Sequence, residues 1–479
     1  MRRRAKIVCT LGPASAAPAV IAQMIDAGMD VARLNTSHGS LDDHIATVKR
    51  VREVAAVAGK HIGVLMDLSG PKLRTGPRPH GPLSLIEGHT VEVTTDIAAA
   101  GGDRVFVPYA GLVDEVGPGE RVLLDDGNIA LRVESREGSD SLRCRIEHGG
   151  ELQANKGIAF PDSELALGAL TERDERAIAA GVAAGVDFFA LSFVSNVADL
   201  ERARHLISQR GADTPIIAKI ERRVALNSLD ELLIEADGAM VARGDLGVEL
   251  PPEEVPWQQR RIIDASARAL IPVITATQML ESMIQSPRPT RAESSDVANA
   301  VWDLSDALML SGETAVGRYP VETVRMMDRI ISRAEAAPDA FRGISATPLN
   351  DDHSYVIALA AKRIVERDAN MRAVVCFTRS GHTATLMSKV HPEAPIFAVS
   401  PTEAICRRLS LARSVIPLHG ALVETSEEML QMVDELLVRD GHLAVGDEVV
   451  VVASLPVRAV GATNFLKLHR IGESVSYQR

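Results

Sequence analysis

Aromatic residues are scarce in this chain of 479 residues, where phenylalanine, tyrosine and tryptophan together make up 3%. Without aromatic side chains on which bases could stack, a platform for single-stranded nucleic acid is not expected. Basic residues are also in the minority, since 52 lysines and arginines face 64 aspartates and glutamates, a formal net charge of −12. This acidic balance argues against nucleic acid and against an anionic membrane surface as partners.

Cysteines are few as well: Cys9, Cys144, Cys376 and Cys406 are scattered, and no two form a CxxC motif. This pattern favours reduced thiols over a disulfide framework or a zinc site. No apolar run approaches the roughly 20 residues that a membrane-spanning helix needs. The basic start, MRRRAKIVCT, lacks the apolar core of a signal peptide. We therefore expect a cytoplasmic protein.

Short apolar runs alternate with helical patterns along most of the chain, which is too long for a single core. The expected strands are residues 6–11, 31–36, 61–68, 188–194, 215–221, 238–245, 272–278 and 307–311. Eight buried strands that alternate with helices predict an α/β fold, a parallel (β/α)8 TIM barrel.

The rhythm breaks after the third strand, where residues 70–156 show short runs with period-two alternation. The sequence DGN at 126–128 sits between two of these runs like a hairpin turn. We therefore expect an inserted small β-barrel lid domain and a C-terminal open α/β domain. The expected division is barrel 1–69, lid 70–156, barrel 157–340, a linker within 337–352, and a C-terminal α/β regulatory domain 353–479.

Polar side chains gather at the carboxyl ends of six expected strands, which is where barrel enzymes place their chemistry. They are Arg33, Asn35, Ser37 and His38; Asp67, Lys72 and Arg74; Lys219 and Glu221; Arg243, Gly244 and Asp245; Thr275, Thr277 and Gln278; and Ser311 and Glu313. A merely solvated rim would place polar residues at both ends alike, but the amino ends carry mostly glycine, proline, alanine and histidine. The asymmetry favours a site.

Two neighbouring strands repeat one spacing. Lys219 and Glu221 are two residues apart, as are Arg243 and Asp245, so each pair is expected to point to one side of its strand. Cations suit phosphate and carboxylates suit Mg²⁺, the combination that phosphoryl transfer needs. The chain has no Walker A and no GxGxxG motif, so a nucleotide must be held in another way.

Eight segments carry a resemblance to a known family: KIVCTLGPAS (6–15), VARLNTSHG (31–39), AKIE (218–221), MVARGDLG (240–247), ATQMLES (276–282), PRPTRAE (287–293), MLSGETA (309–315) and GATN (461–464). In this order they resemble the pyruvate kinase family over almost the whole chain. The resemblance implies a glycolytic transferase that moves the phosphoryl group of phosphoenolpyruvate to ADP, giving pyruvate and ATP.

The resemblance also implies residue roles. Arg33 would bind substrate phosphate, Lys219 would stabilise the moving phosphoryl group, and Thr277 would serve a proton relay. Gly244, Asp245 and Thr277 would hold the substrate carboxylate, while Glu221 and Asp245 would ligate Mg²⁺ or Mn²⁺. Asn35, Ser37, Asp67 and the Leu68 carbonyl match a monovalent-cation site, and Asn35, His38, Arg74 and Lys156 match nucleotide contacts. The lid would close over the site and exclude water.

One departure concerns the monovalent cation. Many family members read DTKGPE after the third strand, whereas this chain reads DLSGPK at 67–72. Lys72 would put a fixed ammonium where K⁺ otherwise supplies charge, and the resemblance implies that members with lysine here work without K⁺. We expect the same, with a solvated lysine as the alternative.

In the last domain, TRSGHT at 378–383 follows an expected strand and opens a helix. Hydroxyls of Thr378, Ser380 and Thr383, with helix N–H groups, would make an anion site. The resemblance implies an allosteric site for the phosphate of a sugar-phosphate effector; the alternative is a plain helix cap. The family resemblance further suggests a homotetramer.

Two rival functions fit parts of the pattern. A metal-dependent TIM-barrel lyase acting on a pyruvate-like oxyacid would use the carboxylates, but not the nucleotide contacts Arg74 and Lys156. A catalytically silent sensor would use only the last domain, and would have no need of Lys219 and Glu221.

Overall fold

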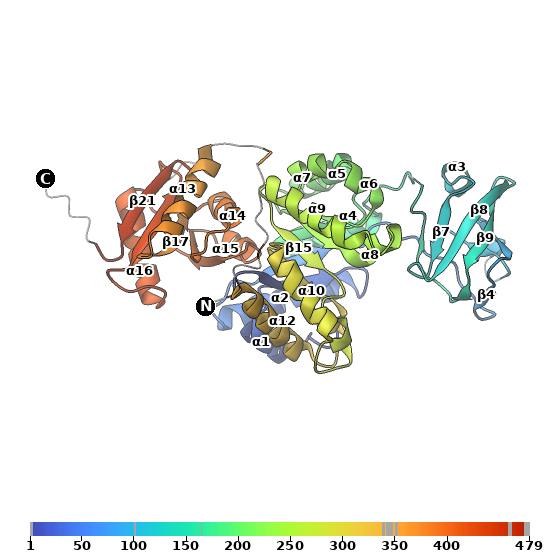
Figure 1. The fold of residues 1–479 in the computed structure, drawn as a ribbon, viewed down its shortest axis with the longest axis horizontal. Helices are drawn as coiled ribbons and strands as arrows, with labels where there is room; N and C mark the ends of the chain where they lie inside the picture. Colours follow the sequence, from blue (N-terminus) through green and yellow to red (C-terminus); the bar gives the residue numbers. More distant parts are fainter. Residues whose placement is uncertain are drawn as a thin grey trace.

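The structure is a computed structural model that describes residues 3–99, 102–163, 165–337, 341, 348–349, 353–457 and 462–473. Figure 1 shows three units in a row: the C-terminal α/β unit, the barrel in the middle, and the inserted β unit at the far end. Most of the expected linker lies outside the described residues, as does Gly461 of the GATN segment.

The barrel closes through eight parallel strands in the order β1-β16-β15-β14-β13-β12-β3-β2. Their bounds are β1 (Lys6–Thr10), β2 (Val31–Asn35), β3 (Gly63–Asp67), β12 (Phe188–Leu191), β13 (Ile216–Ile220), β14 (Gly238–Ala242), β15 (Val273–Ala276) and β16 (Ala307–Leu310). Each corresponds to one expected strand, so the TIM barrel is confirmed. Nearly all of their residues are buried, because helices cover the outside of the sheet.

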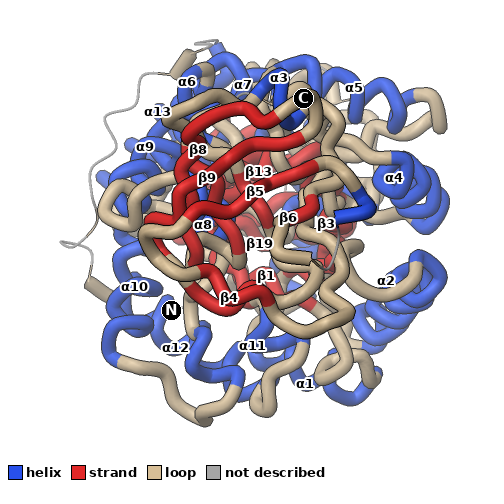
Figure 2. The backbone as a smooth tube through the Cα atoms, turned by 90° about the vertical axis from the view of Figure 1, so that its right-hand side faces the viewer, coloured by secondary structure: helices blue, strands red, loops and turns tan. Residues whose placement is uncertain are grey.

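A ring of helices surrounds the strands (Figure 2). It comprises α1 (Pro18–Ala27), α2 (Leu41–Val57), α4 (Glu172–Ala184), α5 (Val197–Ser208), α6 (Arg223–Asn227), α7 (Leu229–Glu235), α8 (Arg243–Glu249), α9 (Val255–Arg268), η2 (Glu281–Ile284), α10 (Arg291–Trp302), α11 (Gly312–Ala315) and α12 (Pro320–Glu335). Capping boxes at Thr171 and Thr290 start α4 and α10, with each hydroxyl accepting from the backbone N–H three residues on. No described helix has the length and apolar character needed to cross a membrane.

The inserted β unit leaves the barrel after β3. Its elements are β4 (Leu83–Leu85), β5 (Thr90–Thr94), η1 (Ile97–Ala99), β6 (Val105–Phe106), α3 (Leu112–Glu115), β7 (Arg121–Leu124), β8 (Ile129–Glu137), β9 (Ser141–His148), β10 (Gly150–Leu152) and β11 (Ile158–Ala159). A six-stranded sheet, β11-β7-β8-β9-β5-β6, and the pair β10-β4 share one apolar core. The expected turn at 126–128 joins β7 to β8, and β11 lies just beyond residue 156, where the insertion was expected to end.

The C-terminal unit is a five-stranded sheet in the order β19-β18-β17-β20-β21. Its elements are α13 (His353–Arg367), β17 (Met371–Phe377), α14 (His382–Lys389), β18 (Ile396–Ser400), α15 (Glu403–Leu409), β19 (Val415–His419), α16 (Ser426–Arg439), β20 (Glu448–Ala453) and β21 (Phe465–Arg470). Strand β21 is an antiparallel edge strand that is mostly not buried, and it therefore lacks a strong apolar signal in the sequence.

Buried ion pairs join this unit to the amino ends of the barrel strands. The Lys389 ammonium lies 2.7 Å from Asp306, and the Arg413 guanidinium lies 3.1 Å from Glu335. Lys6 donates to the Val415 carbonyl at 2.7 Å. The C-terminal unit therefore closes one end of the barrel, and the carboxyl ends of the strands face the inserted β unit.

Candidate active site

Lys219 and Glu221 lie at the carboxyl end of β13 and point to the same side, as the spacing predicted. The Lys219 ammonium is buried and lies 2.8 Å from Glu221 Oε1 and 3.2 Å from Asp67 Oδ1. It also donates to the Ser192 hydroxyl at 2.6 Å. Opposing charges raise the pKa of Lys219 despite its burial, so it stays a cation.

Asp67 joins the two cations of the site. Its Oδ2 accepts from Arg33 Nε at 2.7 Å, while its Oδ1 faces Lys219. Burial by itself would raise the pKa of Asp67, but Lys219 and Arg33 outweigh it, and the pKa lies below its usual value. An ionised carboxylate therefore holds Arg33 and Lys219 side by side.

Two carboxylates, Glu221 and Asp245, offer a site for a divalent cation. Glu221 Oε2 accepts from the Phe193 N–H at 2.8 Å, and the buried Oε1 forms the 2.8 Å ion pair with Lys219. Burial, and secondarily the charge of Asp245, raises the pKa of Glu221 to about 7. Mg²⁺ often takes only one or two protein carboxylates and completes its shell with phosphate and water, so this donor set fits such an ion.

Arg243 does not join the mouth of the barrel, and the prediction that it points with Asp245 is wrong. Strand β14 ends at Ala242, and α8 begins at Arg243, where residues two apart no longer share a face. The Arg243 guanidinium instead binds Asp296 at 2.7 Å and donates to the Thr277 carbonyl at 2.6 Å. Arg243 therefore binds backbone carbonyls at the end of β15, those of Ala276 and Thr277.

Thr277 follows β15 in a strained conformation. Its φ of 67° and that of Gln278, 54°, lie in the left-handed region, which β-branched residues rarely adopt. The Thr277 hydroxyl accepts from the Gly244 N–H at 2.8 Å. Strain of this kind persists where surrounding structure holds it, and it concentrates at functional sites.

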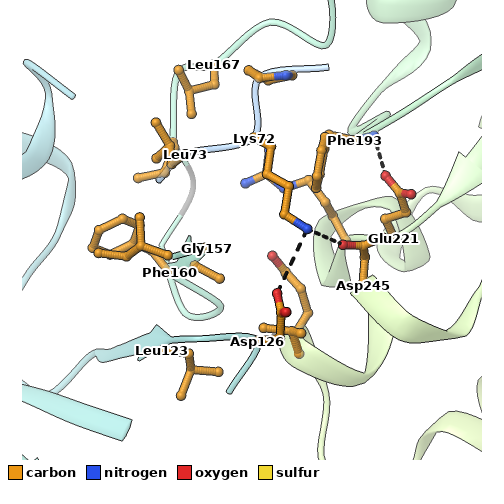
Figure 3. Close-up of a pocket in the computed structure, with 17 residues that line it drawn as sticks. Lys72, Leu73, Leu123, Asp126, Gly157, Phe160, Leu167, Phe193, Glu221 and Asp245 are labelled. Carbon is orange, nitrogen blue, oxygen red and sulfur yellow. Dashed lines mark hydrogen bonds and ion pairs between the residues drawn. The ribbon is translucent and has the colours of Figure 1, made fainter. Parts of the chain in front are cut away.

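Lys72 bridges the barrel to the inserted β unit. Its ammonium lies 3.3 Å from Asp245 Oδ1 and 3.9 Å from Asp126 Oδ1. Dashed lines in Figure 3 mark both ion pairs. The side chain is 39% exposed, so solvent screens both pairs. The Lys72 ammonium thus pairs with Asp245, a carboxylate that the sequence analysis assigned to a divalent cation.

The residues matched to a monovalent cation lie at the ends of the adjacent strands β2 and β3. Asn35 Oδ1 accepts from the Ser37 N–H at 3.1 Å, and the Leu68 carbonyl accepts from the Ser192 hydroxyl at 2.6 Å. Both oxygens of Asp67 face Arg33 and Lys219. Several oxygens of this candidate cation site therefore already accept hydrogen bonds from protein donors.

The residues matched to a nucleotide divide between the barrel and the inserted unit. His38 is exposed beyond β2, and its carbonyl pairs with the His44 ring at 2.8 Å. Arg74 donates to the Asn155 carbonyl at 3.1 Å, and Lys156 lies 2.7 Å from Asp125. Arg74 and Lys156 stand on the two segments that link the units, so a change in the angle between the units would move them relative to His38.

Hydroxyls of the loop before α14 bond within the C-terminal unit. Thr378 accepts from the Gly381 N–H at 3.0 Å and Ser380 from the His382 N–H at 3.4 Å. The Thr383 hydroxyl lies 2.9 Å from that of Thr463. These bonds order the loop at the start of the helix.

Sequence reasoning missed Ser192 and Thr10, which contact Lys219 and Arg33. Both follow the rule applied to the other strands, since Thr10 ends β1 and Ser192 directly follows β12. The six strands with predicted site residues do not include β1 and β12, and the same rule applied to these two strands identifies both residues.

Comparisons with known proteins agree on one family. The model described as "Pyruvate kinase, barrel domain" matches residues 2–324, and "Pyruvate kinase, alpha/beta domain" matches residues 356–469. A pyruvate kinase of Sporosarcina psychrophila is 42% identical over 475 residues, covering 98% of this chain and 81% of the relative. Pyruvate kinases of Mycobacterium tuberculosis (strain ATCC 25618 / H37Rv) and Corynebacterium glutamicum are each 42% identical, over 99% of this chain and 99% and 98% of their own lengths.

Proposed function

The chain belongs to the pyruvate kinase family, and from this premise we propose how its residues carry the family's reaction. The enzyme is a phosphotransferase that takes the phosphoryl group of phosphoenolpyruvate, passes it to ADP, and releases pyruvate and ATP. The family implies a divalent metal. The proposed residue roles rest on one observation. At the carboxyl ends of the barrel strands, each of the side chains of Arg33, Asp67, Lys219 and Glu221 lies within hydrogen-bond distance of another.

Arg33 and Lys219 bind the phosphoryl group. Arg33 offers N–H groups on one side of Asp67, and Lys219 offers its ammonium on the other. As the P–O bond of the enol phosphate breaks, these cations stabilise the charge spread over the phosphoryl oxygens.

Glu221 and Asp245 hold the divalent cation, which we take to be Mg²⁺ or Mn²⁺. When bound, this cation neutralises phosphate charge. The Gly244 N–H and the Thr277 hydroxyl, which lie 2.8 Å apart, receive the substrate carboxylate. The Thr277 hydroxyl then takes part in delivering the proton that converts the enolate carbon to the methyl group of pyruvate.

Asn35, His38, Arg74 and Lys156 contact the nucleotide, and the inserted β unit acts as the lid. Because Arg74 and Lys156 lie at its base, closure would bring cations to ADP while excluding water that competes as phosphoryl acceptor. Lys72, between Asp245 and Asp126, would lock the closed lid at the mouth.

Further proposals concern potassium, a regulatory ligand and assembly. We propose that turnover needs no K⁺, because Lys72 supplies a fixed ammonium at the mouth of the barrel, 3.3 Å from Asp245. Thr378, Ser380 and Thr383 form the loop for the phosphate of a sugar-phosphate effector. A homotetramer, a cytoplasmic location and the exact domain boundaries stay predictions.

A coupled assay for pyruvate tests the function directly. The enzyme should form pyruvate from phosphoenolpyruvate only when ADP and a divalent cation are both present, and ATP should appear in equal amount. The lyase alternative predicts turnover of an oxyacid without ADP, so pyruvate release that ignores ADP would overturn the proposal.

A further inference from the structure

Two buried hydroxyls each accept a hydrogen bond from one of the two cations of the active site. The Thr10 hydroxyl lies 2.9 Å from Arg33 Nη1, and the Ser192 hydroxyl lies 2.6 Å from Lys219 Nζ. Both residues are almost inaccessible, at 4% and 2% exposed. Neither belongs to the substrate or metal residues assigned above.

The direction of each hydrogen bond follows from the single proton of a hydroxyl. Thr10 donates its proton to the Leu310 carbonyl at 2.9 Å, and Ser192 donates to the Leu68 carbonyl at 2.6 Å. Each oxygen therefore presents a lone pair to its cation. Both hydroxyls are fixed at both ends, by a backbone carbonyl and by a cationic side chain.

The residues joined by these hydrogen bonds lie on five adjacent strands of the barrel, or directly after them. Around the barrel the strands β1, β2, β3, β12 and β13 are neighbours, and they carry or lead into Thr10, Arg33, Asp67, Ser192 and Lys219 in that order. Asp67 is the only carboxylate shared by both cations among the described residues. Thr10, on β1, lies on the side of Arg33 opposite the strand of Asp67, whereas Ser192 follows β12, between the strands of Asp67 and Lys219, and its hydroxyl lies 3.5 Å from Asp67 Oδ1.

A hydroxyl suits this position because it is a neutral acceptor. A further carboxylate in place of the hydroxyl would orient the cation equally well but would cancel more of the charge that the phosphoryl oxygens need. A hydroxyl fixes the direction of an N–H bond and leaves the positive charge in place. Without it, a buried N–H would lose its acceptor and the cation could turn away from the substrate.

We propose that Thr10 and Ser192 are positioning residues that aim Arg33 and Lys219 at the phosphoryl group. The proposal rests on the roles given above to these two cations. It predicts that losing either hydroxyl lowers kcat/KM for phosphoenolpyruvate by about tenfold to a hundredfold, the scale of a hydrogen bond to a charged group. The KM for ADP should change little, because neither hydroxyl contacts a residue assigned to the nucleotide.

Thr10 permits a test in which packing and hydrogen bonding predict opposite orders. Thr10→Val keeps the volume and loses the hydroxyl, while Thr10→Ser keeps the hydroxyl and loses a methyl group. We expect Thr10→Ser to stay near the wild-type rate and Thr10→Val to fall. Thr323→Val removes a similarly buried hydroxyl, one that bonds the Tyr319 carbonyl at 2.7 Å in α12, and serves as the matched control. If Thr10→Val turns over like Thr323→Val, or Thr10→Ser is the slower variant, Thr10 only packs.

Ser192→Ala has its matched control in Ser266→Ala. The Ser266 hydroxyl is equally buried and donates to the Ile262 carbonyl at 2.8 Å within α9. Both variants should lose similar thermal stability, but only Ser192→Ala should lose kcat/KM for phosphoenolpyruvate. Equal turnover of the two variants overturns the role of Ser192. Wild-type enzyme that forms no pyruvate from phosphoenolpyruvate and ADP would instead refute the proposed function, so the two failures are distinguishable.

Discussion

Lys219 is the residue on which the proposed chemistry depends most, and Lys219→Met tests it. The substitution keeps most of the side-chain volume and removes the charge, while Asp67 retains its 2.7 Å bond to Arg33. Lys219 is 8% exposed, so water can replace its ammonium poorly. Losing one transition-state charge contact in such a site costs about 2.7–4 kcal/mol, or about 10²–10³ in kcat.

The assay is steady-state pyruvate formation with each substrate varied in turn. We expect kcat and kcat/KM for phosphoenolpyruvate to fall together and the KM for ADP to stay near the wild-type value, because the lost interaction belongs to the transferring group. Lys49→Met, an exposed site on α2, is the control for removing a positive charge. A kcat for Lys219→Met within a few-fold of that of Lys49→Met would refute the role of Lys219.

Three further predictions concern stability and ions. Lys389→Met leaves the fully buried carboxylate of Asp306 without its cation and should lower the free energy of unfolding, measured by urea denaturation, by about 3–5 kcal/mol. Adding Asp306→Asn should recover most of this loss, and a double variant no more stable than Lys389→Met would contradict the prediction. Burial, followed by the charges of Lys389 and Arg413, lowers the pKa of His391 well below its usual value. Below about pH 6.5 the unfolded chain therefore binds a proton at His391 that the folded chain does not bind. Stability should therefore fall by up to about 1.4 kcal/mol per pH unit on acidification, and His391→Phe should flatten that slope; an unchanged slope would count against it. Turnover of the wild type should be the same in potassium-free buffer and with added K⁺, whereas Lys72→Glu should need K⁺; activity of the wild type only with K⁺ would rule the idea out.

The barrel strands were predictable because each is buried on both faces. A strand covered on both sides becomes a run of apolar residues, and eight such runs separated by helical patterns specify one architecture. The helix starts at Thr171 and Thr290 also follow from local sequence, since a capping box depends only on residues three apart. The edge strand β21, with little buried surface, left no comparable pattern.

The site was only partly predictable. Lys219 and Glu221 share a side because β13 carries the extended backbone to its last residues. The same spacing failed for Arg243 and Asp245, because the chain turns into α8 directly after Ala242 and the guanidinium meets Asp296 instead. No side chain caps the start of α8, so the local sequence does not mark where strand β14 ends and the helix begins.

The order of residues alone therefore determined the eight-stranded barrel, the family, and the end of the barrel where charge gathers, because those features follow from local periodicity and motifs. Tertiary structure decided which charges meet. Asp67 comes from β3, Arg33 from β2 and Lys219 from β13, and their contacts depend on how the closed sheet staggers its strands. The physical reason is the sequence separation of the interacting residues. Burial patterns depend on neighbouring residues, whereas the hydrogen bonds between Thr10 and Arg33 and between Ser192 and Lys219 form only once the barrel has closed.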